Sequence, residues 1–297
     1  MSGEGTGVSG TTTSGTATSG TAWRSWAPPG TPGAVADLPA DARPTDALTV
    51  HRSGDPDAPT VVLLHGVTDS GTTWPDLLTH WGDRYDVHAP DLRGHGSSPR
   101  FTPAQMAYAP EVLVADVVAL LDALPEPVAL VGHSLGGVTA LRVALVRPEK
   151  VRALVVEDPA RPTGRRAPEP DFVAGLLGQT RLVIEDRDAE VARMRRETPW
   201  SDTEILAWAA TRGDVDQEYL QHGLFLGDAA WEEAFGALTV PTLLVLPEEA
   251  PMAPRPDGFD NPLVRTAVVP GAGHCVRRDQ PDAYHALVDA FLAEHAG

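Results

Sequence analysis

Cysteine is almost absent from this chain of 297 residues, in which Cys275 is the single one. One cysteine cannot close a disulfide within the chain, nor can it supply the several thiolates of a cysteine-based metal site. Lysine is equally scarce, because Lys150 stands alone, and the formal net charge is −18. Nucleic acids and anionic membrane surfaces repel such a chain, so we expect neither as a partner.

Long apolar runs are also missing. The sequence has no stretch of about 18 apolar residues, which excludes a membrane-spanning helix. Its first residues lack the order of a secretory signal, in which basic residues precede an apolar run and then small residues. With 42% hydrophobic residues the chain can still bury a sizeable core. We therefore expect a globular cytoplasmic protein, and the composition leaves its oligomeric state open.

The N-terminal segment has little that could fold. Residues 2–20 are almost entirely Gly, Ser and Thr, and residues 23–47 are rich in Pro and Ala. The first of these stretches cannot bury enough apolar area to offset the entropy lost on ordering. We expect residues 1–47 to form a disordered tail and residues 48–297 to form the folded domain.

From Leu48 onward, short β-type runs alternate with helical stretches. Several runs are apolar on both faces, which is typical of strands that are covered by helices on both sides. The order strand, helix, strand implies right-handed crossovers and a mostly parallel sheet. The expected strands are Thr49–Arg52, Thr60–Leu64, Tyr85–Ala89, Val128–Val131, Val151–Val156, Pro241–Leu246 and Thr266–Val269, and helices are expected near 73–81, 104–124, 137–147 and 280–295.

This alternation stops between Val156 and Pro241, where charged, tryptophan-bearing helical sequence replaces it. We expect a helical cap inserted at about residues 160–236. Its aromatic residues indicate either a pocket for a mostly apolar substrate or the cap's own core. They are Trp200, Trp208, Phe225 and Trp231.

The most informative motif is a Gly-x-Ser-x-Gly pentapeptide at residues 132–136, between the apolar run Val128–Val131 and a helix-like stretch from Gly137. Where a strand turns directly into a helix, the residue between them is held in a strained backbone conformation. Only small neighbouring residues leave room for this turn. The Ser134 hydroxyl is then expected to project into solvent. The N–H of Leu135, at the helix start, can bind a developing oxyanion.

Two other segments follow expected strands and suit a serine hydrolase. His65-Gly66-Val67 comes after one strand, and the N–H of Val67 is the candidate second oxyanion donor. Gly271-Ala272-Gly273-His274 comes after the last strand, and His274 is the candidate base. Because catalytic groups of open α/β sheets gather at the carboxyl ends of the strands, we expect these residues to meet Ser134.

With these motifs the chain resembles the α/β-hydrolase superfamily, in its capped esterase-like branch, from about Leu48 to the C-terminus. The resemblance implies an α/β-hydrolase fold and a route without metal or cofactor. Ser134 would attack the carbonyl carbon of a small acyl substrate, His274 would take and return the proton, and water would hydrolyse the acyl-Ser134. The family's chain order of serine, acid and histidine is compatible with positions 134 and 274.

The chain departs from the family pattern at the third triad residue. After the penultimate strand it reads Pro247-Glu248-Glu249-Ala250-Pro251, with Ala250 where the family usually has Asp. Asp158, after the strand Val151–Val156, is one candidate acid, because some relatives place the acid there. Glu249 is the alternative, since its extra methylene could offset its position one residue early. A third possibility is that no carboxylate assists His274.

Several activities fit this set of residues. The leading expectation is hydrolysis of a small, mostly apolar carboxylic ester, lactone or thioester. Carbon–carbon bond hydrolysis, lyase and perhydrolase reactions use the same triad on this fold, and a non-catalytic small-molecule receptor is also compatible with Ala250. Serine at position 134 argues against dehalogenase or epoxide hydrolase chemistry, which uses Asp at that place.

Overall fold

The computed structural model describes residues 38–161, 168–226, 231–249 and 259–295. Most of the predicted tail, residues 1–37, therefore lies outside the described residues. The last ten residues of the predicted tail, 38–47, are described and differ from the prediction. They include a 3-10 helix, η2 (Ala40–Ala42), that packs on the domain. The reason is apolar burial: Leu38 and Ala42 join the main hydrophobic core.

Seven strands form one sheet in the order β1-β3-β2-β4-β5-β6-β7. Strand β1 runs antiparallel to β3, and all other neighbours are parallel, so the predicted mostly parallel sheet is confirmed. The strands are β1 (Val50–Gly54), β2 (Thr60–Leu64), β3 (Asp86–Pro90), β4 (Val128–His133), β5 (Val151–Glu157), β6 (Thr242–Pro247) and β7 (Val264–Val269).

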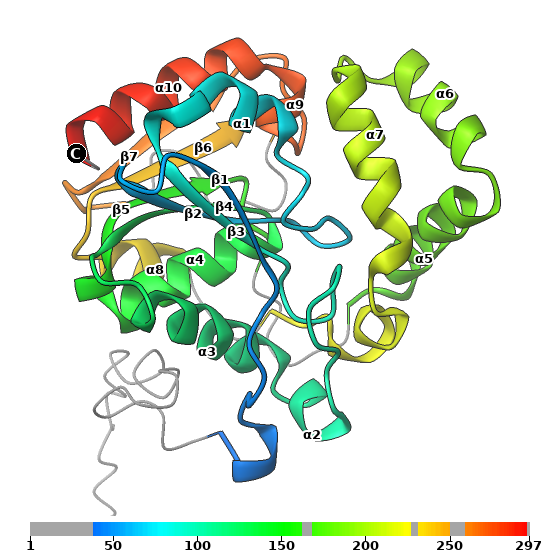
Figure 1. Cartoon of the computed structure of the whole chain (residues 1–297), viewed down its shortest axis with the longest axis horizontal. Coiled ribbons are helices and arrows are strands. Elements are labelled where there is room, and N and C mark those ends of the chain that lie inside the picture. The colour runs from blue at the N-terminus through cyan, green and yellow to red at the C-terminus, as the bar shows by residue number, and fades with distance from the viewer. Residues whose placement is uncertain (1–37, 162–167, 227–230, 250–258, 296–297) are drawn as a thin grey trace, which may run out of the picture.

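Helices cover both faces of this sheet (Figure 1). On one face lie α1 (Pro75–Trp81), α9 (Val276–Asp279) and α10 (Pro281–His295), and on the other lie α3 (Ala109–Asp122), α4 (Leu135–Val146) and α8 (Trp231–Gly236). Alternate residues of β2 serve the two cores: Val61 and Leu63 face one, Val62 and Leu64 the other. This two-sided burial explains why the strand reads as an unbroken apolar run. Short 3-10 helices, η3 (Gly82–Arg84) and η4 (Pro148–Lys150), lead into β3 and β5.

The single helix expected near 104–124 is two helices, α2 (Pro103–Met106) and α3. Pro110 lies in the first turn of α3. Proline has no N–H to continue a helical ladder. The helix that begins at Pro103 therefore ends, and a second helix begins with Pro110 in its first turn.

Between β5 and β6 the chain builds a group of helices, residues 170–223, that we call the helical insertion. It contains α5 (Pro170–Glu185), α6 (Arg187–Glu197), α7 (Asp202–Thr211), the 3-10 helix η5 (Arg212–Asp214) and the π-helix η6 (Tyr219–Gly223). Helices α5, α6 and α7 stand beside the sheet, not on either face (Figure 1). The expected cap also included α8, but α8 buries Trp231 and Phe235 in the core next to α4.

Candidate functional site

The turn between β4 and α4 holds Ser134 in the strained backbone conformation that the pentapeptide predicts. Ser134 precedes the first residue of α4 with φ 52° and ψ −113°, a region that non-glycine residues rarely adopt. Its N–H donates to the carbonyl of Glu157 at 3.0 Å. The flanking glycines are required by close packing: a Cβ on Gly132 would lie 2.3 Å from the Gly136 oxygen, and one on Gly136 would lie 2.0 Å from the Leu64 oxygen.

The Ser134 hydroxyl does not project into open solvent. The residue is only 4% exposed and lines a cavity of about 620 Å³. The expectation that the hydroxyl projects into solvent was wrong, because residues of the helical insertion, among them Phe172 and Leu176, form the other wall of this cavity. A substrate would therefore meet Ser134 inside a pocket of the size that suits small molecules.

Two backbone N–H groups are available beside Ser134. Leu135 is the first residue of α4, Val67 follows β2, and both line the cavity together with Ser134. In the part of the chain that the structure describes, neither N–H has a hydrogen-bond acceptor. Thr68, next to Val67, has a positive φ of 68°. Both N–H groups are therefore available to bind an oxyanion, and that role stays a prediction.

His274 lies against Asp158, one of the two candidate acids. The imidazole Nδ1 is 2.6 Å from Asp158 Oδ2, and the carboxylate is almost fully buried. Asp158 directly follows β5 with a positive φ of 30°. An N–H at Nδ1 that donates to this carboxylate leaves Nε2 as the proton acceptor, which is the tautomer that a general base needs.

Glu249, the alternative acid, is exposed at the end of β6. No hydrogen bond between described residues connects it with His274. Its neighbour Glu248 instead accepts from the backbone N–H of Gly271, at 3.2 Å. Ala250, at the position of the family's usual acid, lies outside the described residues. The geometry therefore favours Asp158 over Glu249.

Ser134 and His274 line the same cavity, but no hydrogen bond of the described chain joins them. The main-chain oxygen of His274 accepts from His133 Nε2 at 3.0 Å, and the two imidazole rings are 4.8 Å apart. Burial holds the pKa of His133 well below its usual value, so this ring stays neutral. Hydrogen bonds between nucleophile and base are often long without substrate and shorten when it binds, so the role of His274 stays a prediction.

Other residues of the sequence motifs hold loops together. The His65 ring accepts at Nε2 from the N–H of Leu92 at 2.9 Å, which joins the loops after β2 and β3. Asp91 accepts from the N–H groups of Gly71 and Ser97. Buried carboxylates at loop starts commonly satisfy backbone donors in this way.

The cavity wall is largely apolar and aromatic. Trp200 and Trp208 line it, whereas Trp231 lies in the core instead. Cys275 also lines the cavity, and burial raises the pKa of its thiol to about 12, so almost no thiolate is present near neutral pH. Among the described residues no group of His, Cys, Asp and Glu is arranged to hold a metal ion.

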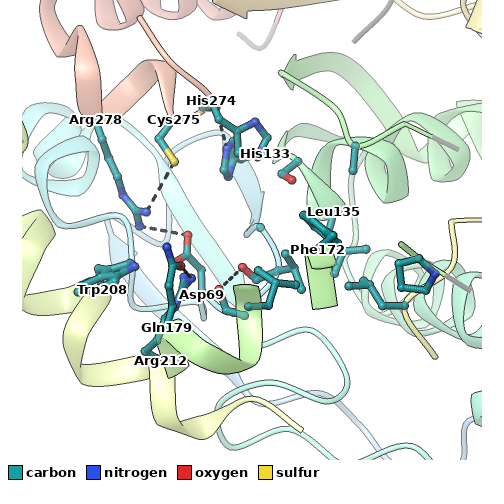
Figure 2. A pocket seen from close by; sticks show the side chains of 18 of the residues that line it. Asp69, His133, Leu135, Phe172, Gln179, Trp208, Arg212, His274, Cys275 and Arg278 are labelled. Carbon is teal, nitrogen blue, oxygen red and sulfur yellow. Dashed lines mark hydrogen bonds and ion pairs between the residues drawn. The ribbon is translucent and has the colours of Figure 1, made fainter. Parts of the chain in front are cut away.

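Sequence reasoning missed a buried ionic cluster at the cavity wall. It is formed by Arg277 and Arg278 of α9, Glu204 of α7 and Asp69 of the loop after β2. Arg278 Nε and Arg277 Nη1 both donate to Glu204 Oε2, at 2.7 and 3.0 Å. Arg278 Nη2 donates to Asp69 Oδ2 at 3.1 Å. This arginine cluster ties the helical insertion to α9, the helix that follows the His274 loop. Figure 2 shows its Arg278 beside Asp69. The adjacent arginines at 277 and 278 were the only available signal.

Glu157, the last residue of β5, predicts a pH dependence of stability. Burial raises the pKa of this carboxyl from 4.5 to about 7, although Arg277 opposes the shift. The folded state therefore binds the proton more tightly than the unfolded state, and the stabilisation this provides is lost as pH rises from about 4.5 to 7. The side chain of Glu157→Gln stays neutral at every pH. The Tm of this variant minus the Tm of the wild type should therefore be larger at pH 8 than at pH 5. Thermal unfolding at both values checks this, and an unchanged difference contradicts it.

No helix of the described residues is both long and apolar enough to cross a membrane.

Comparison with known proteins shows the family to which the chain belongs. The chain matches the alpha/beta hydrolase family over residues 61–287. A pimeloyl-[acyl-carrier protein] methyl ester esterase of Aeromonas hydrophila is 30% identical over 260 residues, which cover 83% of this chain and 99% of that protein. The lipase LipV of Mycobacterium tuberculosis is 41% identical over 114 residues, which cover 38% of this chain and 42% of the lipase.

Among solved structures, the enol-lactonase from Burkholderia xenovorans superposes with a TM-score of 0.65 at 20% identity, covering 83% of this chain and 96% of that one. This likeness concerns the fold. The family match covers most of the chain, and it includes the strand, strained turn and helix around Ser134. On these grounds the protein belongs to the alpha/beta hydrolase family.

Proposed function

We propose that the protein is a serine hydrolase that cleaves a small, mostly apolar carboxylic ester, lactone or thioester through an acyl-Ser134 intermediate. The observation that carries the proposal is the 2.6 Å contact between His274 Nδ1 and the buried Asp158 carboxylate, beside the cavity that Ser134 lines. The names of the esterase and lipase relatives support ester cleavage.

The proposed reaction has two halves. Ser134 Oγ attacks the carbonyl carbon while His274 Nε2 takes its proton, and the N–H groups of Val67 and Leu135 bind the oxyanion that forms. His274 then protonates the leaving oxygen or sulfur, which leaves the acyl group on Ser134. In the second half water attacks the acyl carbon, His274 takes the water proton and returns it to Ser134, and the acid departs. Asp158 stabilises the imidazolium in both halves.

The cavity favours an apolar acyl or alcohol group. Leu135, Phe172, Leu176, Trp200 and Leu224 contribute apolar surface to its wall. A receptor without activity was compatible with the sequence because Ala250 removed the usual acid. The position of Asp158 against His274 weakens that alternative, since a buried carboxylate on the imidazole is what turnover needs.

A fluorophosphonate probe tests the reaction class. We expect it to form a covalent adduct on the peptide that contains Ser134, because only a serine activated by a base attacks the phosphorus at a useful rate. Mass spectrometry of digested protein identifies the site. Heat-unfolded protein, in which the triad is dispersed, is the matched control and should not react. A folded protein that stays unlabelled would support the receptor instead.

A further inference from the structure

Arg212 is a buried arginine of the cavity wall without a carboxylate partner. It begins η5, directly after α7, and is only 7% exposed. Nη2 donates to Gln179 Oε1, and the guanidinium lies over the Trp208 ring at 5.3 Å. Its Nε has no hydrogen-bond partner, and no carboxylate of the described residues forms an ion pair with it.

Three other buried arginines, Arg93, Arg277 and Arg278, pair with carboxylates. Arg93 holds Asp116 through Nε and Nη2, at 2.8 and 2.9 Å, and Arg278 donates to Glu204 and Asp69. The pKa directions reflect this difference. The pKa of Arg278 is raised because nearby negative charges outweigh burial, whereas burial lowers the pKa of Arg212. Burying an unpaired charge is expensive, and Arg212 lacks the counter-ion that Arg93, Arg277 and Arg278 have.

Asp69 is the negative charge that acts most strongly on Arg212, and it is already engaged. Its Oδ2 accepts from Arg278 at 3.1 Å and lies 4.0 Å from Arg277. Its Oδ1 has no partner in the described structure, but two guanidiniums already share the single charge of this carboxylate. Asp69 therefore offsets Arg212 only at a distance.

The charged side chains that line the cavity are mostly arginines. Four arginines line the cavity, against two carboxylates. Of these arginines, Arg193 is paired with Glu190 and Glu197 of its own helix, and Arg278 with the arginine cluster. A local positive site inside a chain of net charge −18 concentrates anions where they would otherwise be repelled. The lining charged residues are Arg161, Arg193, Arg212, Arg278, Asp69 and Glu169.

We propose that Arg212, held in place by Gln179, binds a carboxylate group of the substrate at the part of the cavity away from His274. Figure 2 shows Arg212, Gln179 and Trp208 together, separated from His274 and His133. Nε is enclosed by protein atoms, so a carboxylate would bind at the Nη1 and Nη2 end of the guanidinium, where two N–H groups point the same way. Gln179 takes one of the two Nη2 protons and leaves the other for this purpose.

This inference rests on the proposed hydrolase and narrows its substrate class. The substrate would carry a scissile ester at one end, an apolar stem along the cavity and a carboxylate at the other end. A neutral ester of the same length would leave Arg212 buried and unpaired. The cost of this unpaired charge is what would let the pocket discriminate the carboxylate substrate from the neutral one.

Paired substrates test the proposal. We would compare p-nitrophenyl monoesters of dicarboxylic acids of increasing length with counterparts in which the free carboxylate is masked as a methyl ester. At the length that spans the cavity, the wild type should favour the carboxylate form by about tenfold or more in kcat/KM, mainly through KM. Arg212→Gln should remove most of this ratio, and Arg212→Lys, which keeps charge but not the planar fork, should retain part of it.

Arg195→Gln is the matched control. Arg195 is an exposed arginine of α6 that pairs with Asp202 and does not line the cavity. It makes the same change in net charge, so an equal loss of the ratio in this variant would point to a general charge effect and overturn the proposal. No preference in the wild type at any length, or a preference that Arg212→Gln keeps, would also overturn it.

Thermal shift separates this proposal from the hydrolase proposal, because it needs no turnover. Free dicarboxylates should raise the Tm of the wild type but not that of Arg212→Gln. Inorganic phosphate is the probe for a general anion site: an equal shift with phosphate would assign Arg212 to free anions and overturn the substrate role. If no ester is cleaved but dicarboxylates bind through Arg212, the hydrolase fails and the carboxylate site stands. If esters are cleaved but wild-type Tm stays constant, the carboxylate site fails alone.

Discussion

Ser134→Ala should reduce the turnover of short p-nitrophenyl esters by at least about a thousandfold. Cys275, the thiol among the described residues that line the cavity, does not replace the nucleophile, since its raised pKa keeps it protonated. The measurement is release of p-nitrophenolate at saturating and limiting substrate, which separates kcat from KM.

The same variant should fold normally. The Ser134 side chain contributes no hydrogen bond to the described structure, and Ala takes the same backbone conformation with one atom fewer. We expect a Tm within a few degrees of the wild type, because losing one small hydroxyl changes stability little. Residual activity within about tenfold of the wild type, in a variant that is shown to be folded, would remove Ser134 from the mechanism.

Asp158→Asn should lower kcat by roughly 10² to 10⁴ with little change in KM. Asn fits the buried space of Asp158, but its amide carries no charge to stabilise the imidazolium. It can also hold the ring with the proton on the wrong nitrogen. Substrate binding does not require the carboxylate, so KM is spared. Steady-state kinetics on the same esters measure both constants.

Glu249→Gln is the companion experiment and should change kcat by less than about threefold, because exposed substitutions away from the reacting groups have small effects. The opposite pattern, a severe Glu249 variant and a mild Asp158 variant, would transfer the role of the acid to Glu249. Two mild single variants with a crippled double variant would mean that either carboxylate can serve His274. A fully active double variant would leave His274 without an acid partner.

The layered sheet was predictable because burial on two faces leaves a plain signal. Residues 61–64 and 128–131 read as apolar runs, and both are buried strands. The Ser134 turn was predictable for a similar reason, since its two glycines are required by contacts of 2.3 and 2.0 Å. Helix boundaries were harder: Pro110 splits α2 from α3, a local effect that hydrophobic periodicity does not reveal.

The acid and the charged interior could not be predicted in the same way. Asp158 lies 116 residues before His274, and whether it or Glu249 reaches the imidazole depends on how neighbouring strand ends are placed. Arg212, Arg277 and Glu204 read as surface residues in the sequence, because charged side chains are rarely buried unless they are paired. Only the folded chain shows which partners each one has.

Glu204 also limits how this protein can be re-engineered. It belongs to the helical insertion, whereas the two arginines that it neutralises belong to α9, outside the insertion. A chimaera that exchanged residues 170–223 for the helices of another hydrolase would need an acidic residue at the same place. Without one, two guanidiniums would be buried with half of their counter-charge, at a loss of about 3–5 kcal/mol. Directed evolution of specificity should therefore vary cavity-facing side chains and keep the insertion itself.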